Sequence, residues 1–176
     1  MVTAESDVEP PAAGPAERTP TESTPRATRI RATLLAVAVV LAAVDLIVKH
    51  LVEQAHPAGP DFGFLSVRLS YNPGIAFSLG DTLPAWVVIA LTSAVTLGIT
   101  LYALHTAPEV PTAARAGMSM ILAGAAGNLI DRIADGAVTD YLYTGWFPTF
   151  NLADSLLTCG VVLLIASTLR AESRAD

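Results

Sequence analysis

The uncharged apolar run Leu83–Leu104 is the feature that most limits what this chain can fold into. A helix needs about 20 apolar residues to cross the hydrocarbon core of a bilayer, which is roughly 30 Å thick. The run therefore predicts a transmembrane helix. The composition agrees, because 52% of the residues are hydrophobic and only 15% are charged, whereas about 25% are charged in an ordinary soluble domain. The sequence indicates an integral membrane protein.

Three further membrane-spanning helices are predicted from the other apolar segments. They cover Ala32–Val52, about Thr112–Arg132 and about Ala153–Leu169. The first is interrupted late by Asp45 and Lys49, and the third ends in a polar cluster. We therefore expect an all-α integral membrane fold with four transmembrane helices.

The first 29 residues differ in composition from the rest of the chain. They are rich in Pro, Thr, Glu, Ala and Ser and show no apolar periodicity, so they cannot bury enough apolar surface to offset the entropy lost on ordering. A cleaved secretory signal is not indicated, because the first apolar run continues for a full membrane span. We expect a disordered tail over residues 1–29, a membrane domain over 30–170 and a short tail over 171–176.

Basic residues lie mostly on one side of the predicted helices. Seven of the ten precede the first or third span or follow the fourth, and the other three are Lys49, Arg68 and Arg132. Short loops rich in Lys and Arg stay in the cytoplasm. Both termini and the 105–115 loop are therefore predicted to be cytoplasmic.

Polar side chains gather at the opposite, outer ends of the predicted helices. They are Asp45, Asn128, Asp131, Asp140 and Asp154. A charged side chain near the hydrocarbon is costly unless it faces protein or water, so such groups are functional-site hypotheses by default. Two of them, Asp140 and Asp154, lie only fourteen residues apart in a chain otherwise suited to lipid, and such a pair indicates acid–base chemistry at the outer face.

The outer loop 53–82 is predicted to contain a small sheet. Apolar and polar residues alternate over 65–71, which is the period of a half-buried strand. The turn Asn72-Pro73-Gly74 follows, and a second alternation contains Ile75, Phe77 and Leu79. We expect this sheet to lie on the outer surface of the membrane.

Five short motifs occur along the predicted membrane domain. They are Asp45 with Lys49, Asn72-Pro73-Gly74-Ile75-Ala76-Phe77, Gly127-Asn128-Leu129-Ile130-Asp131-Arg132, Val138-Thr139-Asp140-Tyr141 and Phe150-Asn151-Leu152-Ala153-Asp154-Ser155. In this order and spacing the chain resembles the lipoprotein signal peptidases, the type II signal peptidases of bacteria, over roughly residues 30–170. Each motif alone is weak, but five in order on a four-span frame are very specific. The chain departs from the family at Tyr141, where Phe is common, and in its longer N-terminal tail.

The resemblance implies four transmembrane helices, a small extracytoplasmic β-cradle and an aspartic endopeptidase in the bacterial cytoplasmic membrane. Such an enzyme removes the signal peptide of a prolipoprotein by cleaving before its diacylglyceryl-modified cysteine. By motif match the catalytic residues are Asp140 and Asp154. Supporting or substrate-binding roles fall on Asp45, Lys49, Asn72, Gly74, Phe77, Asn128, Asp131, Arg132 and Asn151. The resemblance also implies no metal or cofactor, and a monomer whose partners are prolipoproteins and membrane phospholipid.

The chemistry of two adjacent carboxyl groups agrees with this implication. Two such groups a few Å apart cannot both ionise cheaply, so they share a proton and titrate as a unit. One can then take a proton from water, while the other, still protonated, hydrogen-bonds the scissile carbonyl. A simpler interpretation is that Asp154 only caps the fourth helix.

Simpler interpretations also stay open for the supporting residues. Asp45 and Lys49 have the spacing of an intramembrane ion pair, and Asp131 could form a local network with Arg132. Phe77 could be an ordinary residue of the sheet core.

Two other functional classes compete with the peptidase. An ion-coupled transporter could relay protons or cations through the aspartates, but it would need acids spread through the membrane depth or internal repeats. A metal-dependent hydrolase would use the aspartates as ligands, and activity in excess chelator would distinguish it. The histidines show no ligand spacing for a zinc site, and nothing in the sequence indicates nucleic-acid binding.

Overall fold

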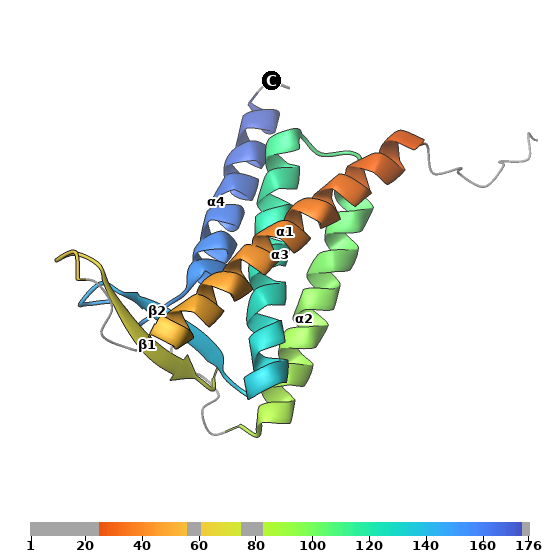
Figure 1. Ribbon diagram of the computed structural model, residues 1–176. Helices are drawn as coiled ribbons and strands as arrows, with labels where there is room; N and C mark the ends of the chain where they lie inside the picture. The colour runs from red at the N-terminus through yellow and green to blue at the C-terminus, as the bar shows by residue number, and fades with distance from the viewer. Residues whose placement is uncertain (1–24, 56–60, 75–82, 174–176) are drawn as a thin grey trace, which may run out of the picture.

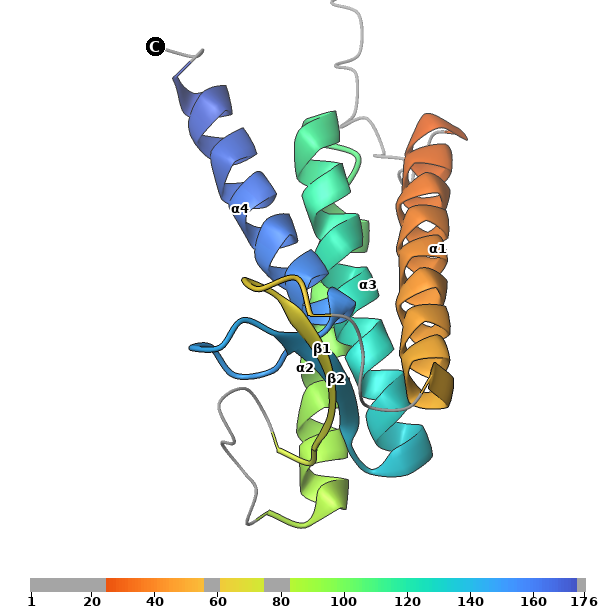
Figure 2. The ribbon, with the colours of Figure 1, turned by 60° about the vertical axis from the view of Figure 1, so that its left-hand side comes forward.

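The computed structural model describes residues 25–55, 61–74 and 83–173. The elements follow in the order α1 (Pro25–Ala55), β1 (Ser66–Asn72), α2 (Ala85–Thr106), α3 (Thr112–Asp135), β2 (Val138–Tyr143) and α4 (Leu152–Glu172). Helix α3 lies in the middle of the bundle and contacts the other three helices (Figures 1 and 2). Both strands lie toward one end of the bundle, and the start of α1 and the end of α4 lie at the other end (Figure 1).

Three of the described helices, α1, α2 and α4, are long and apolar enough to cross a membrane. Their outward sides carry bare hydrophobic side chains, with Val39 66%, Leu97 59% and Val162 62% exposed. Such continuous apolar surface is not left in contact with water, and lipid is its natural solvent. The chain is an integral membrane protein, as the composition predicted.

Helix α3 fails that test of composition, although it was predicted as the third of four spans. It has 24 residues, but its last turns carry polar and charged side chains. Most of them are buried against the neighbouring helices, so they face protein rather than lipid.

Helix α1 begins earlier than predicted. Residues 25–29, expected in the disordered tail, form its first turns. Proline suits the start of a helix because its missing N–H would have no helical acceptor. The rest of the expected tail, residues 1–24, lies outside the described residues.

Helices α3 and α4 pack with their backbones close together because small residues face each other. A Cβ added at Gly117 would lie 2.7 Å from the Gly160 carbonyl oxygen, and one added at Gly160 would meet Gly117 at the same distance. A Cβ at Gly124 would collide with the carbonyl oxygen of Ala153. The run of small residues in α3 therefore serves close helix packing, as membrane helices commonly do.

Strand β1 matches the predicted strand over 65–71 to within one residue, and its partner is β2. The two strands pair antiparallel, with Ser70 opposite Asp140 and Asn72 opposite Val138. No strand was predicted where β2 lies, because its first four residues are all buried and so show no alternation of polar and apolar residues. The second predicted alternation, which contains Phe77, lies outside the described residues.

The chain folds back after β2 and returns beside it. The Phe150 carbonyl accepts the N–H groups of Tyr141 at 3.0 Å and Leu142 at 2.7 Å, and the Phe150 N–H donates to Leu142 at 3.0 Å. Helix α4 begins two residues later. This hairpin places the first turn of α4 against the middle of β2.

Candidate active site

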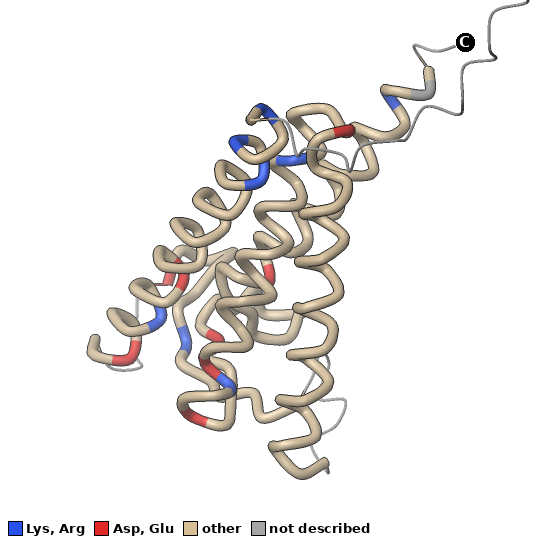
Figure 3. The backbone as a smooth tube through the Cα atoms, turned by 90° about the vertical axis from the view of Figure 1, so that its right-hand side faces the viewer, with Lys and Arg blue, Asp and Glu red and all other residues tan. Residues whose placement is uncertain are grey.

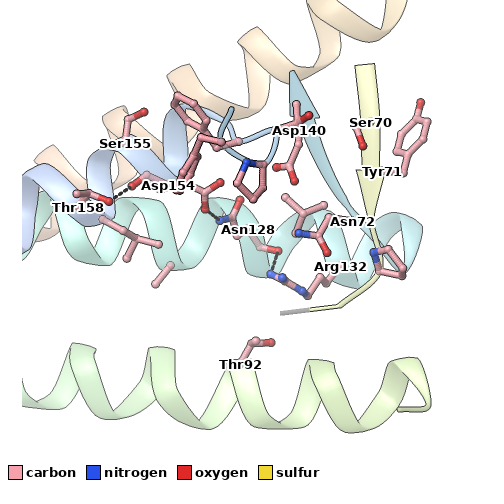
Figure 4. A pocket seen from close by; sticks show the side chains of 18 of the residues that line it. Ser70, Tyr71, Asn72, Thr92, Asn128, Arg132, Asp140, Asp154, Ser155 and Thr158 are labelled. Atoms are coloured by element: carbon pink, nitrogen blue, oxygen red, sulfur yellow. Dashed lines mark hydrogen bonds between the residues drawn. The ribbon is translucent and has the colours of Figure 1, made fainter. Parts of the chain in front are cut away.

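Asp140 and Asp154 both line one groove (Figure 4). Asp140 lies in β2 and is only 4% exposed. Asp154 lies in the first turn of α4. The hairpin that ends at Phe150 brings these two elements together, since its backbone hydrogen bonds fix the start of α4 beside β2.

Asn151 connects the two aspartates. Its amide nitrogen Nδ2 donates to Asp140 Oδ1 at 2.8 Å, and its backbone N–H donates to Asp154 Oδ2 at 3.2 Å. Its Oδ1 accepts the backbone N–H of Asp154 at 2.9 Å. Asn151 is therefore the N-cap of α4, and Asp154 completes a capping box with it. Asp154 therefore does take part in capping α4, through Oδ2, but it does more than cap the helix, because Oδ1 has another partner.

That other partner is Asn128 of α3. Its Nδ2 donates to Asp154 Oδ1 at 2.8 Å (Figure 4). Its Oδ1 accepts two hydrogen bonds, from Lys49 Nζ at 2.9 Å and from Asn151 Nδ2 at 3.1 Å. Asn128 thus links α1 and α3 to the aspartate of α4.

Lys49 lies at the centre of a buried ionic cluster. Its ammonium is 2.8 Å from Asp45 Oδ2 and 2.9 Å from Asp131 Oδ2. The predicted pairing of Asp45 with Lys49 is confirmed, whereas the ion pairs of the described residues do not include Asp131 with Arg132. Removing one member of such a cluster leaves an uncompensated buried charge, which typically costs about 3–5 kcal/mol.

The two carboxylates of this cluster also hold the backbone beside the aspartate pair. Asp45 Oδ1 accepts the N–H of Ala153 at 2.8 Å, and Asp131 Oδ2 accepts the N–H of Thr139 at 3.2 Å. Each of these N–H groups belongs to the residue directly before a candidate catalytic aspartate. Gly127 makes room for this arrangement, because a Cβ there would lie 2.6 Å from Asp45 Oδ2.

Arg132 holds the turn that follows β1. Its Nη2 donates to the Gly74 carbonyl at 2.8 Å, and its Nη1 donates to the Asn128 carbonyl at 3.2 Å. The Gly74 N–H in turn donates to Asn72 Oδ1 at 3.1 Å, and the Asn72 side chain hydrogen-bonds Asp140. The structure therefore brings all the predicted site residues of the described chain into one network.

Tyr141 contributes a contact that the sequence did not predict. Its hydroxyl accepts the N–H of Leu152, the first residue of α4, at 3.2 Å. Burial raises the pKa of Tyr141 to about 12, so the hydroxyl stays neutral at physiological pH. A phenylalanine at this position would leave that N–H without this partner.

The electrostatic environment favours a proton on Asp140. Burial and, to a smaller extent, the negative charge of Asp154 raise the pKa of Asp140 from 3.8 to about 6. Hydrogen bonds from Asn72 and Asn151 and the charge of Lys49 act in the opposite direction. A raised carboxyl pKa caused by burial and a like charge is typical of sites that carry out acid–base chemistry.

This pKa predicts how stability depends on pH. The folded-state value lies above the ordinary 3.8, so the contribution of Asp140 is fully present below about pH 3.8 and is lost as the pH rises through about 6. Above pH 6 an ionised Asp140 should destabilise the fold by about 3 kcal/mol. Asp140→Asn should therefore be more stable than wild type at pH 7.5 and about equal at pH 4, measured by thermal unfolding in detergent. Parallel pH curves for the two proteins would contradict the raised pKa.

The groove beside the aspartate pair has a volume of about 1360 Å³. Its walls come from α2, α3, α4, both strands and the loop before α4, and they are largely apolar. Thr92 of α2 lies across from Asn128 and Arg132 (Figure 4). Sequence reasoning missed the contribution of α2, because its residues Leu91, Thr92 and Val95 look like any lipid-facing segment. Within the described ranges no group of three or more His, Cys, Asp or Glu side chains is placed to hold a metal ion.

Comparisons with known proteins agree with the motifs. The sequence model of the signal peptidase (SPase) II family matches residues 37–170. A lipoprotein signal peptidase from Dehalococcoides mccartyi is 40% identical over 113 residues, which cover 60% of this chain and 68% of that protein. One from Bartonella tribocorum is 37% identical over 139 residues, which cover 74% of this chain and 83% of that protein.

A solved structure shows the same fold. A bacterial membrane enzyme determined at 2.3 Å resolution superposes with a TM-score of 0.69 at 26% identity, over 82% of this chain and 92% of that structure. The segment matched by the family model contains the aspartate pair and every residue of the network around it.

Proposed function

The chain belongs to the signal peptidase II family, whose members are proteases that remove signal peptides from prolipoproteins, and from this premise we propose that Asp140 and Asp154 are its catalytic pair. The observation that supports the proposal is the bridging by Asn151, which hydrogen-bonds both carboxyl groups at 2.8 and 3.2 Å. The negative charge of Asp154 also raises the pKa of Asp140, so the two carboxyl groups interact and are expected to titrate as a unit. The bond cleaved is the one before the lipid-modified cysteine.

The surroundings of the two aspartates divide their roles. Both oxygens of Asp154 accept hydrogen bonds from N–H donors, and Asp154 lies near the positive end of the α4 dipole, which suits an ionised carboxylate. Asp140, with its pKa raised to about 6, holds the shared proton. Asp154 is then the general base toward water, and Asp140 is the acid.

Cleavage follows from this division. Asp154 takes a proton from water as the water oxygen bonds to the scissile carbonyl carbon, and Asp140 donates a hydrogen bond to the carbonyl oxygen. The tetrahedral intermediate then breaks its C–N bond, and a proton passes to the leaving amine. Because the pair needs one proton, cleavage should depend on pH with a bell shape.

The groove suits a lipid-modified peptide. Its apolar walls on α2 and α4 can take acyl chains and the hydrophobic part of a signal peptide, while the peptide bond lies at the aspartate pair. The experiment that tests the function is incubation of the purified protein with a diacylated prolipoprotein. Release of the signal peptide, unchanged by excess chelator, is the expected result, and loss of activity in chelator would favour a metal-dependent hydrolase.

Helix α3 is the fourth transmembrane helix in this proposal. Its position between α1, α2 and α4 supports a full crossing, since the surrounding helices shield its polar residues from lipid. The family match over 37–170 supports a peptidase domain over residues 30–170, flanked by cytoplasmic tails.

The active site lies at the outer face of the cytoplasmic membrane. Figure 3 shows most of the basic residues at one end of the bundle and most of the acidic residues toward the other. The basic end contains the starts of α1 and α3 and the end of α4, with Arg26, Arg29, Arg31, Arg115 and Arg170. The positive-inside rule makes that end cytoplasmic.

Labelling at the two ends of α3 tests this topology. Ala113 and Ala134 are both exposed and lie near opposite ends of the helix. In a Cys159→Ser background, a membrane-impermeant thiol reagent added to intact cells should label Ala134→Cys and leave Ala113→Cys unlabelled. Both should be labelled after the cells are opened. Labelling of Ala113→Cys from outside would reverse the orientation, and labelling of both from outside would show that α3 does not cross the membrane.

A further inference from the structure

We infer that Lys49 is a positioning residue that fixes the orientation of the Asn128 amide, and through that amide the carboxylate of Asp154. The inference rests on the proposed catalytic role of Asp154. It gives Lys49 a role beyond the ion pair that its spacing from Asp45 suggests.

The orientation of the Asn128 amide is decided by the chemistry of its partners. An ammonium group has three donors and no acceptor, so the atom of Asn128 that lies 2.9 Å from Lys49 Nζ must be the oxygen. The amide nitrogen must then point the other way, where it lies 2.8 Å from Asp154 Oδ1. If the amide turned over, its oxygen would face the carboxylate without a hydrogen, and a charge-assisted hydrogen bond would become a repulsion.

Lys49 cannot easily give up this contact. Its ammonium forms ion pairs with Asp45 Oδ2 at 2.8 Å and Asp131 Oδ2 at 2.9 Å and donates a hydrogen bond to Asn128 Oδ1 at 2.9 Å. Only 2% of the residue is exposed, so water does not compete for the ammonium. The two carboxylates are themselves held by the backbone N–H groups of Ala153 and Thr139. The ammonium is therefore fixed in place, which makes it a rigid reference for the amide.

If Lys49 served only in an ion pair, a neutral residue that donates to Asn128 would be no better than one that does not. Two double variants with the same net charge distinguish this role from a positioning role. Lys49→Met with Asp131→Asn removes one positive and one negative charge, so the net charge of the cluster stays the same. Lys49→Gln with Asp131→Asn has that same net charge, but the glutamine amide can still donate to Asn128 Oδ1. The single variant Asp131→Asn is the reference for both.

The Met double variant should lose about 10- to 100-fold in kcat relative to Asp131→Asn, the size expected for a lost hydrogen bond to a charged group. KM should change less than about threefold, because Lys49 lies away from the groove lining. Relative to the Gln double variant, the acidic limb of the pH profile should move up by about one unit, since the ionised general base loses a donor. The Gln double variant should keep the kcat of Asp131→Asn. Both double variants lose the charge of Lys49, which lowers the pKa of Asp140, so their pH profiles are compared with each other.

The pH readout is interpreted against the other charges that face this cluster. They are Asp45 and Glu53 from α1, Asp131 and Arg132 from α3, Asp140 from β2 and Asp154 from α4. All of them except Asp131 are unchanged in the variants, and Asp131 is absent from all three proteins that are compared.

Equal kcat and equal pH profiles for the Met and Gln double variants would overturn the inference, whether both are active or both are impaired. If neither double variant folds, Lys49→Arg is measured instead, because its guanidinium keeps a donor toward Asn128. A KM near the wild-type value and an unchanged pH profile of Lys49→Arg would support the inference. A shifted pH profile of this variant, in folded protein, would overturn it. Failure of the catalytic proposal would be recognised separately, as turnover that persists in Asp154→Asn.

Discussion

Asp140→Asn and Asp154→Asn should each reduce prolipoprotein cleavage by about 1000-fold or more. An amide can neither take a proton from water nor share one with its partner, so each change removes the acid–base function of the pair. The measurement is release of the signal peptide from a diacylated prolipoprotein by purified protein in detergent or lipid. Asp135→Asn is the matched control, because Asp135 is an exposed acid at the end of α3. This variant should cleave the prolipoprotein at the wild-type rate.

The double variant Asp140→Asn with Asp154→Asn should be little worse than either single variant. Groups that act as a unit lose their function together, so their effects do not add. Thermal unfolding distinguishes this loss from misfolding, because Asp140→Asn should be at least as stable as wild type at neutral pH. Substantial turnover by either single variant, in a preparation free of endogenous peptidase, would remove that residue from the catalytic pair.

Gly124→Ala should have the second largest effect, although Gly124 lies outside the polar network. The added Cβ would collide with the carbonyl oxygen of Ala153, and backbone cannot move aside as a flexible side chain can. Helices α3 and α4 must then separate, which should lower the free energy of unfolding by about 1–3 kcal/mol or more. Because Ala153 directly precedes Asp154, the catalytic aspartate should shift with it, and cleavage should fall at least tenfold.

Gly98→Ala is the control for this substitution. Gly98 lies in α2, and a Cβ there would meet nothing within 4 Å. The change should leave cleavage unaffected and stabilise the helix by about 0.5–1 kcal/mol, since alanine loses less backbone entropy than glycine. Thermal unfolding of both variants in the same detergent gives the comparison. Equal stability of the two would show that α4 can move away from α3 without cost.

Features encoded within one segment could be predicted from the sequence. The apolar runs predicted the membrane helices α1, α2 and α4, and the alternation over 65–71 predicted β1. The spacing of Asp45 and Lys49 predicted their ion pair at 2.8 Å. The ordered motifs named the family and both aspartates of the proposed pair. In each case a repeat of 3.6 or 2 residues, or a short motif, carries the information.

The tertiary structure decided everything that depends on contacts between distant segments. Lys49 meets Asn128 across 79 residues of sequence, and Asp45 meets Ala153 across 108. No periodicity in the sequence records such a meeting, since it results from the packing of α1 against α3 and α4 and from the hairpin that ends at Phe150. The sequence alone determined that this chain enters a membrane and indicated which two aspartates are the candidate catalytic pair. Helix packing and hairpin closure determined that one asparagine, Asn151, holds both of them, because only the folded backbone brings its three polar groups within hydrogen-bond distance of the pair.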